Sequence, residues 1–517
     1  MRRPEKLALI AAVLSAQAAF SEQAAMADQT GPTFTAVPLA DHIYDGGWEH
    51  YVGGGLAVFD CNGDDLPELF AAGGENPSQL FRNTTDSRTA ALSFVPQTPE
   101  ALALTGVTGA YPLDIDGDGI LDLAVLRAGA DVLLKGLGAC DFTRFDRLAV
   151  TGDDRWTTGF SATWEAGNDL PTLAFGTYVD RSDPDGPFGT CDDTLLYRPV
   201  DGSYGAPRLL SPGYCALSVL FSDWNRSGRA DLRLSNDRHY YVRGGQEQMW
   251  AMETDPRLYS AEEGWRPYAL WGMGIASRDM NGDGLQDVYL TSMGDQKFQL
   301  QSPATDGPVW EDVTYGYGTT AHRPYTGGDG RPSTGWHAAF GDVNNDGRDD
   351  IFVTKGNVEQ MPDAAQKDPN NLMLQQTDGT FSEVGEAAGI ASLHRGRGGA
   401  LVDLNRDGLL DIAVVNRRAP MEVWQNTSAA AGNWILLQLR APAPNTRAIG
   451  AFVEIDIDGR ILTREVTVGG GHAGGDSGDL HVGLGDAESA MIRVIWPGGR
   501  AGNWQRVMRN QRVVLTP

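Results

Sequence analysis

The sequence predicts an all-β fold, a seven-bladed β-propeller followed by a small β-sandwich or barrel-like domain. Three observations carry this prediction. An acidic motif recurs between residues 60 and 411, a β-rich apolar run follows each complete copy, and the repeats stop before residue 433. Repeats of about 50 residues are typical of propellers and related arrays, in which each repeat forms one small sheet.

The motif has the form D-x-[DN]-x-[DS]-x-x-x-[DE]. A degenerate copy at residues 164–172 lacks the acids at the first, third and last positions, and successive copies are 50–63 residues apart. This spacing leaves room for a four-stranded sheet and a long loop in each repeat. The six complete copies begin at Asp60, Asp114, Asp223, Asp279, Asp342 and Asp403.

Short apolar runs after the motifs predict strands, because they are rich in Val, Ile, Leu and aromatic residues. Glycine-rich segments such as 53–55 and 398–399 precede several copies, and small residues there allow strands to pack closely near a crowded axis. We expect a strand around residues 34–39 to close the ring, because closure removes exposed sheet edges. The predicted runs are 69–71, 123–125, 232–234, 288–290, 351–353 and 412–414.

The chain divides into three predicted parts. Residues 1–27 read as a signal peptide, with Arg2, Arg3 and Lys6 before an apolar run and a small-residue cleavage site ending at Ala27. Residues 28–432 hold the repeats, and residues 433–517 form a separate β-domain. We therefore expect an exported protein, periplasmic or secreted, and the choice between general and twin-arginine export stays open.

Charge and cysteine content narrow the classes of partner. The formal net charge of −27, from 41 Lys and Arg against 68 Asp and Glu, disfavours nucleic acid and anionic membrane surfaces. No later stretch reaches the roughly 18 apolar residues of a membrane span. Four cysteines allow three pairings. Because Cys191 and Cys215 are close in sequence, we expect them to pair, which leaves Cys61 with Cys140.

The motif spacing suits a hard divalent cation. Alternating residues of a tight loop direct side-chain oxygens from positions one, three, five and nine toward one point, and the backbone carbonyl at position seven adds another. We predict structural Ca²⁺ at each complete copy. The predicted ligands are Asp60, Asn62, Asp64, Leu66 and Glu68; Asp114, Asp116, Asp118, Ile120 and Asp122; Asp223, Asn225, Ser227, Arg229 and Asp231; Asp279, Asn281, Asp283, Leu285 and Asp287; Asp342, Asn344, Asp346, Arg348 and Asp350; and Asp403, Asn405, Asp407, Leu409 and Asp411.

Two other interpretations of these loops are an EF-hand and a solvated acidic turn without a cation. An EF-hand needs a Glu at position twelve, where all six copies carry an apolar residue, so that interpretation is excluded. Solvated acidic turns are the simpler alternative, since Asp, Asn and Gly favour turns. Turn preference alone does not fix which alternate positions carry oxygen, so six copies in register favour the cation.

The segments 114–122, 279–287 and 403–411 resemble FG-GAP/VCBS repeats of integrin-α-type propellers. In the last 85 residues, Arg447-Ala448-Ile449-Gly450-Ala451, Gly469-Gly470-Gly471, residues 480–485 and residues 494–499 resemble the ASPIC/UnbV domain of the cartilage acidic protein-like family. The resemblance implies a secreted calcium-binding propeller with a C-terminal ASPIC/UnbV module and no settled enzymatic activity.

Other candidate sites are weaker. The glycine-rich loop 469–479 lacks the Lys-Ser/Thr of a phosphate loop, and His472, Asp476 and His481 lack an accompanying nucleophile motif, so we expect a structural turn. The insertion 315–331 is either a recognition surface or filler. The insertion 180–187 is expected to be a turn, with a further cation site as the alternative.

The function predicted from these features is that of a non-enzymatic binding or adhesion module for protein or glycan. Two alternatives stay open. One is a polysaccharide-active hydrolase or lyase with its site at the propeller axis, where ligands commonly lie in a concave site. The other is a periplasmic assembly or maturation factor.

Overall fold

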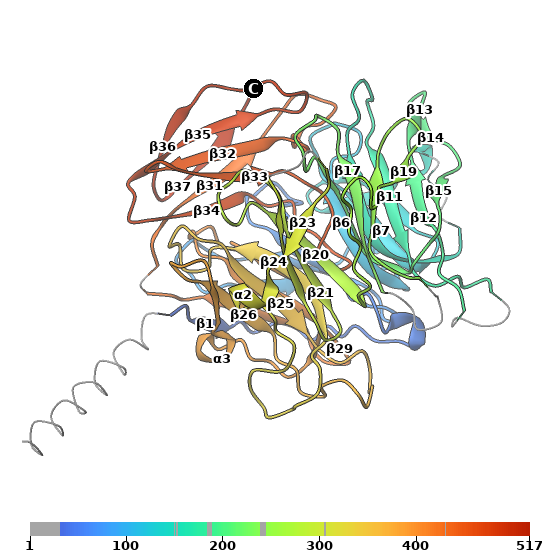
Figure 1. Cartoon of the computed structure of the whole chain (residues 1–517), viewed down its shortest axis with the longest axis horizontal. Helices are drawn as coiled ribbons and strands as arrows, with labels where there is room; N and C mark the ends of the chain where they lie inside the picture. Colours follow the sequence, from blue (N-terminus) through green and yellow to red (C-terminus); the bar gives the residue numbers. More distant parts are fainter. Residues whose placement is uncertain are drawn as a thin grey trace, which may run out of the picture.

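The computed structural model describes residues 31–148, 150, 153–183, 189–237, 244–303, 307–429 and 431–517, and these residues form an all-β protein (Figure 1). The predicted signal peptide and residues 184–187 of one insertion lie outside them. The described helices are short, and none is long and apolar enough to span a membrane. They are η1 (Trp48–His50), η2 (Glu100–Leu102), η3 (Asp146–Leu148), α2 (Thr314–Tyr317) and α3 (Gly385–Ala388).

Antiparallel quartets of strands succeed one another along residues 56–426. The first three are β2 (Leu56–Phe59), β3 (Glu68–Ala71), β4 (Gln79–Asn83) and β5 (Phe94–Pro96); β6 (Val107–Leu113), β7 (Asp122–Gly129), β8 (Val132–Gly138) and β9 (Asp141–Arg144); and β10 (Arg155–Thr163), β11 (Thr172–Thr177), β12 (Thr194–Tyr197) and β15 (Arg208–Leu210), with the hairpin β13 (Pro199–Val200) and β14 (Ser203–Tyr204) before β15. A short β7 to β10 pairing joins the second and third quartets into one eight-stranded sheet.

The remaining quartets follow the same order. They are β16 (Ala216–Ser222), β17 (Asp231–Asn236), β18 (Gln248–Ala251) and β19 (Arg257–Leu258); β20 (Gly272–Arg278), β21 (Asp287–Ser292), β22 (Lys297–Gln301) and β23 (Trp310–Asp312); β24 (Gly335–Gly341), β25 (Asp350–Lys355), β26 (Asn371–Gln375) and β27 (Phe381–Glu383); and β28 (Arg395–Val402), β29 (Asp411–Arg417) and β30 (Glu422–Asn426), completed by the N-terminal β1 (Phe34–Ala36).

The first strand of each quartet lies next to the first strand of the following one, from β2 through β6, β10, β16, β20 and β24 to β28, which returns to β2. The predicted closing strand is confirmed, because Phe34 pairs with Asn426 of β30. Each complete acidic motif lies in the turn between the first two strands of a quartet, and the predicted strand after it begins at or next to its last residue. The motif loops therefore all lie at one end of the inner strands.

The tail, residues 433–517, packs two sheets face to face. Its core includes Ile435, Leu437, Val453 and Ile492, all nearly inaccessible to solvent. One sheet has the order β34 (Leu480–Gly485), β31 (Asn433–Leu439) and β37 (Gln511–Leu515); the other has β33 (Arg460–Glu465), β32 (Phe452–Ile457), β35 (Ser489–Ile495) and β36 (Gln505–Met508).

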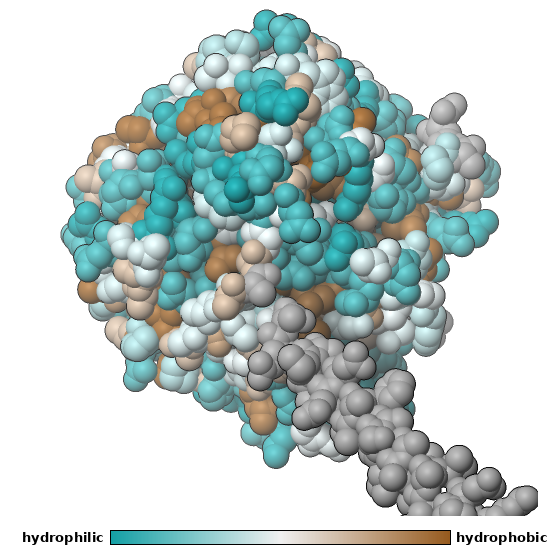
Figure 2. Space-filling view, turned by 90° about the vertical axis from the view of Figure 1, so that its left-hand side faces the viewer, coloured by the Kyte–Doolittle hydropathy of each residue, from teal (hydrophilic) through white to brown (hydrophobic). Residues whose placement is uncertain are grey.

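Both predicted disulfides are present, Cys61 to Cys140 and Cys191 to Cys215. The first joins a motif loop of one quartet to the β8–β9 turn of the next. On the face shown in Figure 2, hydrophobic residues lie in small groups among hydrophilic ones, as expected for a surface in contact with water.

Candidate metal centres

Each of the six acidic loops, named here by its first residue, folds around that residue's carboxylate. In loop 114, Asp114 Oδ1 accepts the backbone N–H of Gly117 at 2.9 Å and Oδ2 that of Gly119 at 2.8 Å. Both glycines have positive φ, 72° and 89°, a conformation that suits glycine. The other loops repeat the arrangement at Asp60, Asp223, Asp279, Asp342 and Asp403.

The ninth-position carboxylate ties its loop to the third strand of the quartet. Asp122 Oδ2 accepts the Ile115 N–H and Oδ1 accepts the Gly136 N–H of β8, both at 2.8 Å. The same pair of bonds recurs at Asp287, Asp350 and Asp411. These carboxylates thus have a structural role that sequence reasoning missed, because the donors are backbone groups that leave no signature in the sequence.

Burial makes the charge of these groups costly. Desolvation raises the pKa of Asp122 to about 7 and that of Asp287 to about 8, and neighbouring carboxylates of the same loop add to both shifts. Desolvation also raises the pKa of Asp350 and Asp411 well above the usual range. A buried cluster of this kind gains stability from any cation that offsets the mutual repulsion.

Loop 114 brings one oxygen each of Asp114, Asp116 and Asp122 within 4.8 Å of one another. Asp116 Oδ1 is buried and has no hydrogen-bond partner among the described residues. Lys135 Nζ lies 2.5 Å from Asp116 Oδ2 and from Asp118 Oδ2. Arg147 also lies 2.9 Å from Asp116 Oδ2. The oxygens of loop 114 fit a hard cation, and a lysine and an arginine already offset part of their charge.

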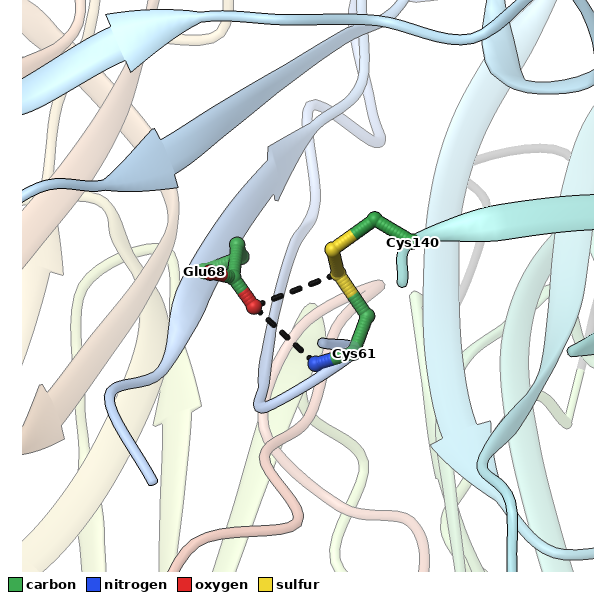
Figure 3. Close-up of side chains that lie close together, drawn as sticks. All are labelled: Cys61, Glu68 and Cys140. Carbon is green, nitrogen blue, oxygen red and sulfur yellow. Dashed lines mark hydrogen bonds between the residues drawn. A yellow bond between two sulfur atoms is a disulfide. The ribbon is translucent and has the colours of Figure 1, made fainter. Parts of the chain in front are cut away.

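In loop 60, Glu68 points to the disulfide (Figure 3): its Oε2 accepts the Cys61 N–H at 2.9 Å and lies 3.2 Å from Cys61 Sγ. Because both sulfurs are held in the disulfide, Cys61, Glu68 and Cys140 do not form a thiolate metal site. Desolvation raises the pKa of Glu68 to about 8, and Asp64 and Asp60 act in the same direction.

The fifth-position residues are tied back into their loops. In loops 60, 279, 342 and 403 the third-position Asn amide donates to the fifth-position Asp, at 2.8–3.1 Å. The other oxygen of that Asp accepts the N–H of position seven, as Asp283 does from Leu285 at 2.9 Å. The predicted ligands at positions three and five are therefore brought together in these four loops, and internal hydrogen bonds engage their polar atoms.

Loop 223 is different. Asp231 Oδ2 accepts the Trp224 indole N–H at 2.9 Å and the Tyr259 hydroxyl at 2.7 Å, and Oδ1 accepts the Met252 N–H at 2.8 Å. Arg229 Nε lies 3.3 Å from the same carboxylate. Side-chain donors and a guanidinium thus satisfy Asp231 without a cation, so this loop fits a metal poorly.

The tail covers the end of the inner strands that carries the acidic loops (Figure 1). Thr446 Oγ1 donates to Asp114, and the Thr463 N–H donates to Asp279 Oδ2 at 3.1 Å. Glu465 Oε1 accepts the Asp223 N–H at 2.7 Å, and the Gly485 N–H donates to the Asn345 carbonyl at 2.8 Å. These four loops therefore face the tail of their own chain.

The loop between β33 and β34 enters the ring of inner strands. Residues 468–476, called the axial segment, form bridges with five inner strands, at Val58, Ala110, Ala162, Leu220 and Ile275. The expected structural turn is therefore a longer segment that pairs with the ring, and β33 ends at Glu465 because the chain leaves the sheet there. No sequence signal distinguishes such a segment from an ordinary glycine-rich turn.

Three polar side chains considered for a site are not joined into one. His472 Nε2 accepts the Gly53 N–H at 3.2 Å, and Nδ1 lies 3.1 Å from the Met273 carbonyl. His481 Nε2 instead lies 3.0 Å from the Gly408 carbonyl. Asp476 forms a backbone β-bridge with Val58, and no hydrogen bond joins the three side chains within the described ranges.

The insertion 315–331 leaves Tyr315 81% exposed.

Sequence comparisons match the same two regions. The model named ASPIC and UnbV matches residues 441–517, and the FG-GAP-like repeat model matches residues 60–125. Cartilage acidic protein 1 of Mus musculus is 25% identical over 243 residues, 44% of this chain and 34% of that protein. The Xenopus tropicalis protein of the same name is 35% identical over 97 residues, 19% of this chain and 12% of that protein.

The chain is similar to the cartilage acidic proteins over part of its length. It combines an FG-GAP-like region with an ASPIC/UnbV region, which confirms the family resemblance seen in the sequence. The matched regions span about a third of the mouse protein and a smaller share of the Xenopus protein. Among solved structures, the BP39L lectin from Burkholderia pseudomallei has a TM-score of 0.44 and 13% identity over 73% of this chain and 96% of that one.

Proposed function

We propose that the protein is an exported, calcium-binding, seven-bladed β-propeller that acts as a non-enzymatic binding module for protein or glycan. Two features support the propeller: the circuit of inner strands returns from β28 to β2, and the N-terminal β1 completes the last quartet against β30. Two disulfides support folding in an oxidising compartment. The observation that carries the calcium proposal is the set of buried ninth-position carboxylates arranged in register.

Calcium is assigned to five loops, 60, 114, 279, 342 and 403. Ca²⁺ takes six to eight oxygen ligands, including carboxylates, amide oxygens and backbone carbonyls. Loops 60, 279, 342 and 403 offer all three kinds, and loop 114 offers carboxylates and a backbone carbonyl. Loop 223 is left out because Trp224, Tyr259 and Arg229 already engage Asp231. When bound, the cation supplies positive charge to the loop and no chemistry on a substrate.

The enzyme alternative places a site at the axis of the ring. The axial segment runs there and pairs with five inner strands, so the inner wall contacts the protein's own chain. This favours a binding role for outer surfaces. The assembly-factor alternative has no specific observation in its favour.

Calorimetric titration of calcium into chelator-treated protein tests the proposal. We expect about five sites of the affinity found in extracellular modules, roughly 10⁻⁴ to 10⁻³ M. Asp283→Asn, at position five of loop 279, is expected to remove one site. Ser227→Ala, at the same position of loop 223, serves as the matched control and is expected to leave the stoichiometry unchanged. Wild-type protein that takes up no calcium would overturn the assignment.

A further inference from the structure

A cavity of 250 Å³ lies between loops 60 and 403 and the tail. Its walls carry the carboxylates of Asp60, Asp65, Asp403 and Asp479 and the guanidinium groups of Arg406, Arg440 and Arg447, with Gln438 and Ser477 beside them. This volume is slightly smaller than the roughly 300–1,000 Å³ of pockets for drug-sized ligands. The cavity is therefore of a size for one small polar molecule.

The Arg447 side chain lines this cavity. Its guanidinium makes no hydrogen bond and no ion pair with any residue that the structure describes, although the residue is half-buried. Burial lowers its pKa and the charge of Arg440 acts in the same direction, whereas Asp114, Asp60 and Asp479 act in the opposite direction. The guanidinium carries five N–H donors, which are open to solvent or to a ligand in the cavity.

The nearest carboxylates are already engaged. Asp114 accepts three loop N–H groups and the Thr446 hydroxyl. Asp479 pairs with Arg512 at 2.5 Å and with Arg406 at 3.8 Å. Asp60 accepts backbone N–H groups of its own loop. None lies within ion-pair distance of Arg447, so the guanidinium is not simply the partner of the acidic loops.

Arg440 is a second arginine of the cavity wall that has no carboxylate partner among the described residues. Its Nε donates a hydrogen bond to Gln438 Oε1 at 2.8 Å. Two guanidinium groups that both lack a carboxylate line one small space. A planar anion is the group that such donors bind best, by paired N–H···O bonds.

We propose that this cavity binds a sugar acid, with its carboxylate held by Arg447 and Arg440 and its hydroxyl groups facing Gln438 and Ser477. The inference rests on the proposed function in one respect. Calcium in loops 60 and 403 offsets the negative charge of Asp60, Asp403 and the other carboxylates that line the cavity, which would otherwise repel an anion.

Glucuronate binding to the full chain tests the proposal, measured by calorimetry with calcium present. Glucose and acetate are the comparison ligands, because each keeps only one half of the proposed recognition. We expect glucuronate to bind at least tenfold more tightly than either. Arg447→Gln is expected to weaken glucuronate at least tenfold, whereas Arg500→Gln, at an exposed tail arginine, is expected to bind as the wild type does.

The outcomes separate the two proposals. Wild-type protein that binds calcium but not glucuronate overturns the sugar-acid site alone, as does Arg447→Gln with unchanged affinity. Acetate as tight as glucuronate also overturns it, because recognition would then involve no sugar. Glucuronate bound without any calcium uptake supports the arginine site, and it overturns both the calcium proposal and the need for calcium to offset the lining carboxylates. Calcium heats for Arg447→Gln that match the wild type show that the variant is folded.

Discussion

At the scale of single residues, glycines of the inner strands make room for the axial segment. A Cβ atom built on Gly55 or on Gly109 would lie 1.8 Å from the Ala473 carbonyl oxygen. Neither glycine has positive φ, so the requirement is space and not backbone conformation. Both are small because another backbone lies against them.

Gly109→Ala is expected to lower the free energy of unfolding by about 2 kcal/mol or more, since overpacking a filled site typically costs 1–3 kcal/mol. Gly316→Ala is the matched control, because its Cβ would meet nothing within 4 Å. Denaturant titration of both variants measures the difference. Equal stability of the two would mean that the axial segment does not lie against β6.

His472 is fully buried and is held as a neutral imidazole, with Nε2 accepting the Gly53 N–H. Burial lowers its pKa to about 3, and the charges of Arg397 and His337 act in the same direction. The backbone N–H of His472 donates to His337 Nδ1 at 3.1 Å. Protonation of His472 would remove the acceptor at Nε2.

The lowered pKa of His472 makes the free energy of unfolding depend on pH. Between about pH 6.5 and pH 3 the unfolded chain binds a proton at His472 that the folded chain excludes, so stability falls as the pH falls, by about 1.4 kcal/mol per pH unit. His472→Gln is expected to be less stable at pH 7.5 but to have a slope shallower by that amount between pH 6 and pH 4. Urea unfolding at fixed calcium measures both slopes, and equal slopes would contradict the assignment.

At the scale of elements, the two disulfides close loops of different length. The Cys61–Cys140 bond joins residues 79 apart, across two quartets, whereas Cys191–Cys215 joins residues 24 apart. In the chain-entropy account, a longer closed loop removes more freedom from the unfolded chain. The bond between quartets should therefore stabilise the fold more.

Replacing each pair by alanine tests that difference. Cys61→Ala with Cys140→Ala is expected to cost about 1 kcal/mol more than Cys191→Ala with Cys215→Ala, the difference that the loop lengths give. Thermal and denaturant unfolding of the two double variants provide the measurement. A greater loss from the shorter loop would show that local packing around the buried Cys215 outweighs chain entropy.

At the scale of the whole molecule, the acidic loops and the tail form one interface. Hydrogen bonds link the tail to Asp114, Asp279 and Asn345, and the axial segment adds the Gly471 N–H to the Ile275 carbonyl at 2.7 Å. If the loops hold calcium as proposed, removing the cations leaves their carboxylates to repel one another, and the surface that the tail contacts then changes with calcium. Calcium binding and tail docking are thus coupled in the proposed function.

Hydrogen exchange in calcium and in chelator tests the coupling. Amides of residues 470–477, including the Ser477 N–H bonded to the Val58 carbonyl at 3.0 Å, are expected to exchange at least tenfold faster in chelator. Those of β32, in the core of the tail, are expected to change less, because their bonds lie within the tail. Equal protection of the axial segment in both buffers would separate the loops from tail docking.

The sequence by itself determined the strands after each motif, the closing strand at Phe34 and both disulfides. These features depend on residues close in sequence or on a regular repeat, where local preference and spacing suffice. The tertiary structure alone decided what occupies the axis and what covers the loops. His472 and Gly53 are 419 residues apart, and a glycine reads the same in sequence whether it turns the chain or admits another segment.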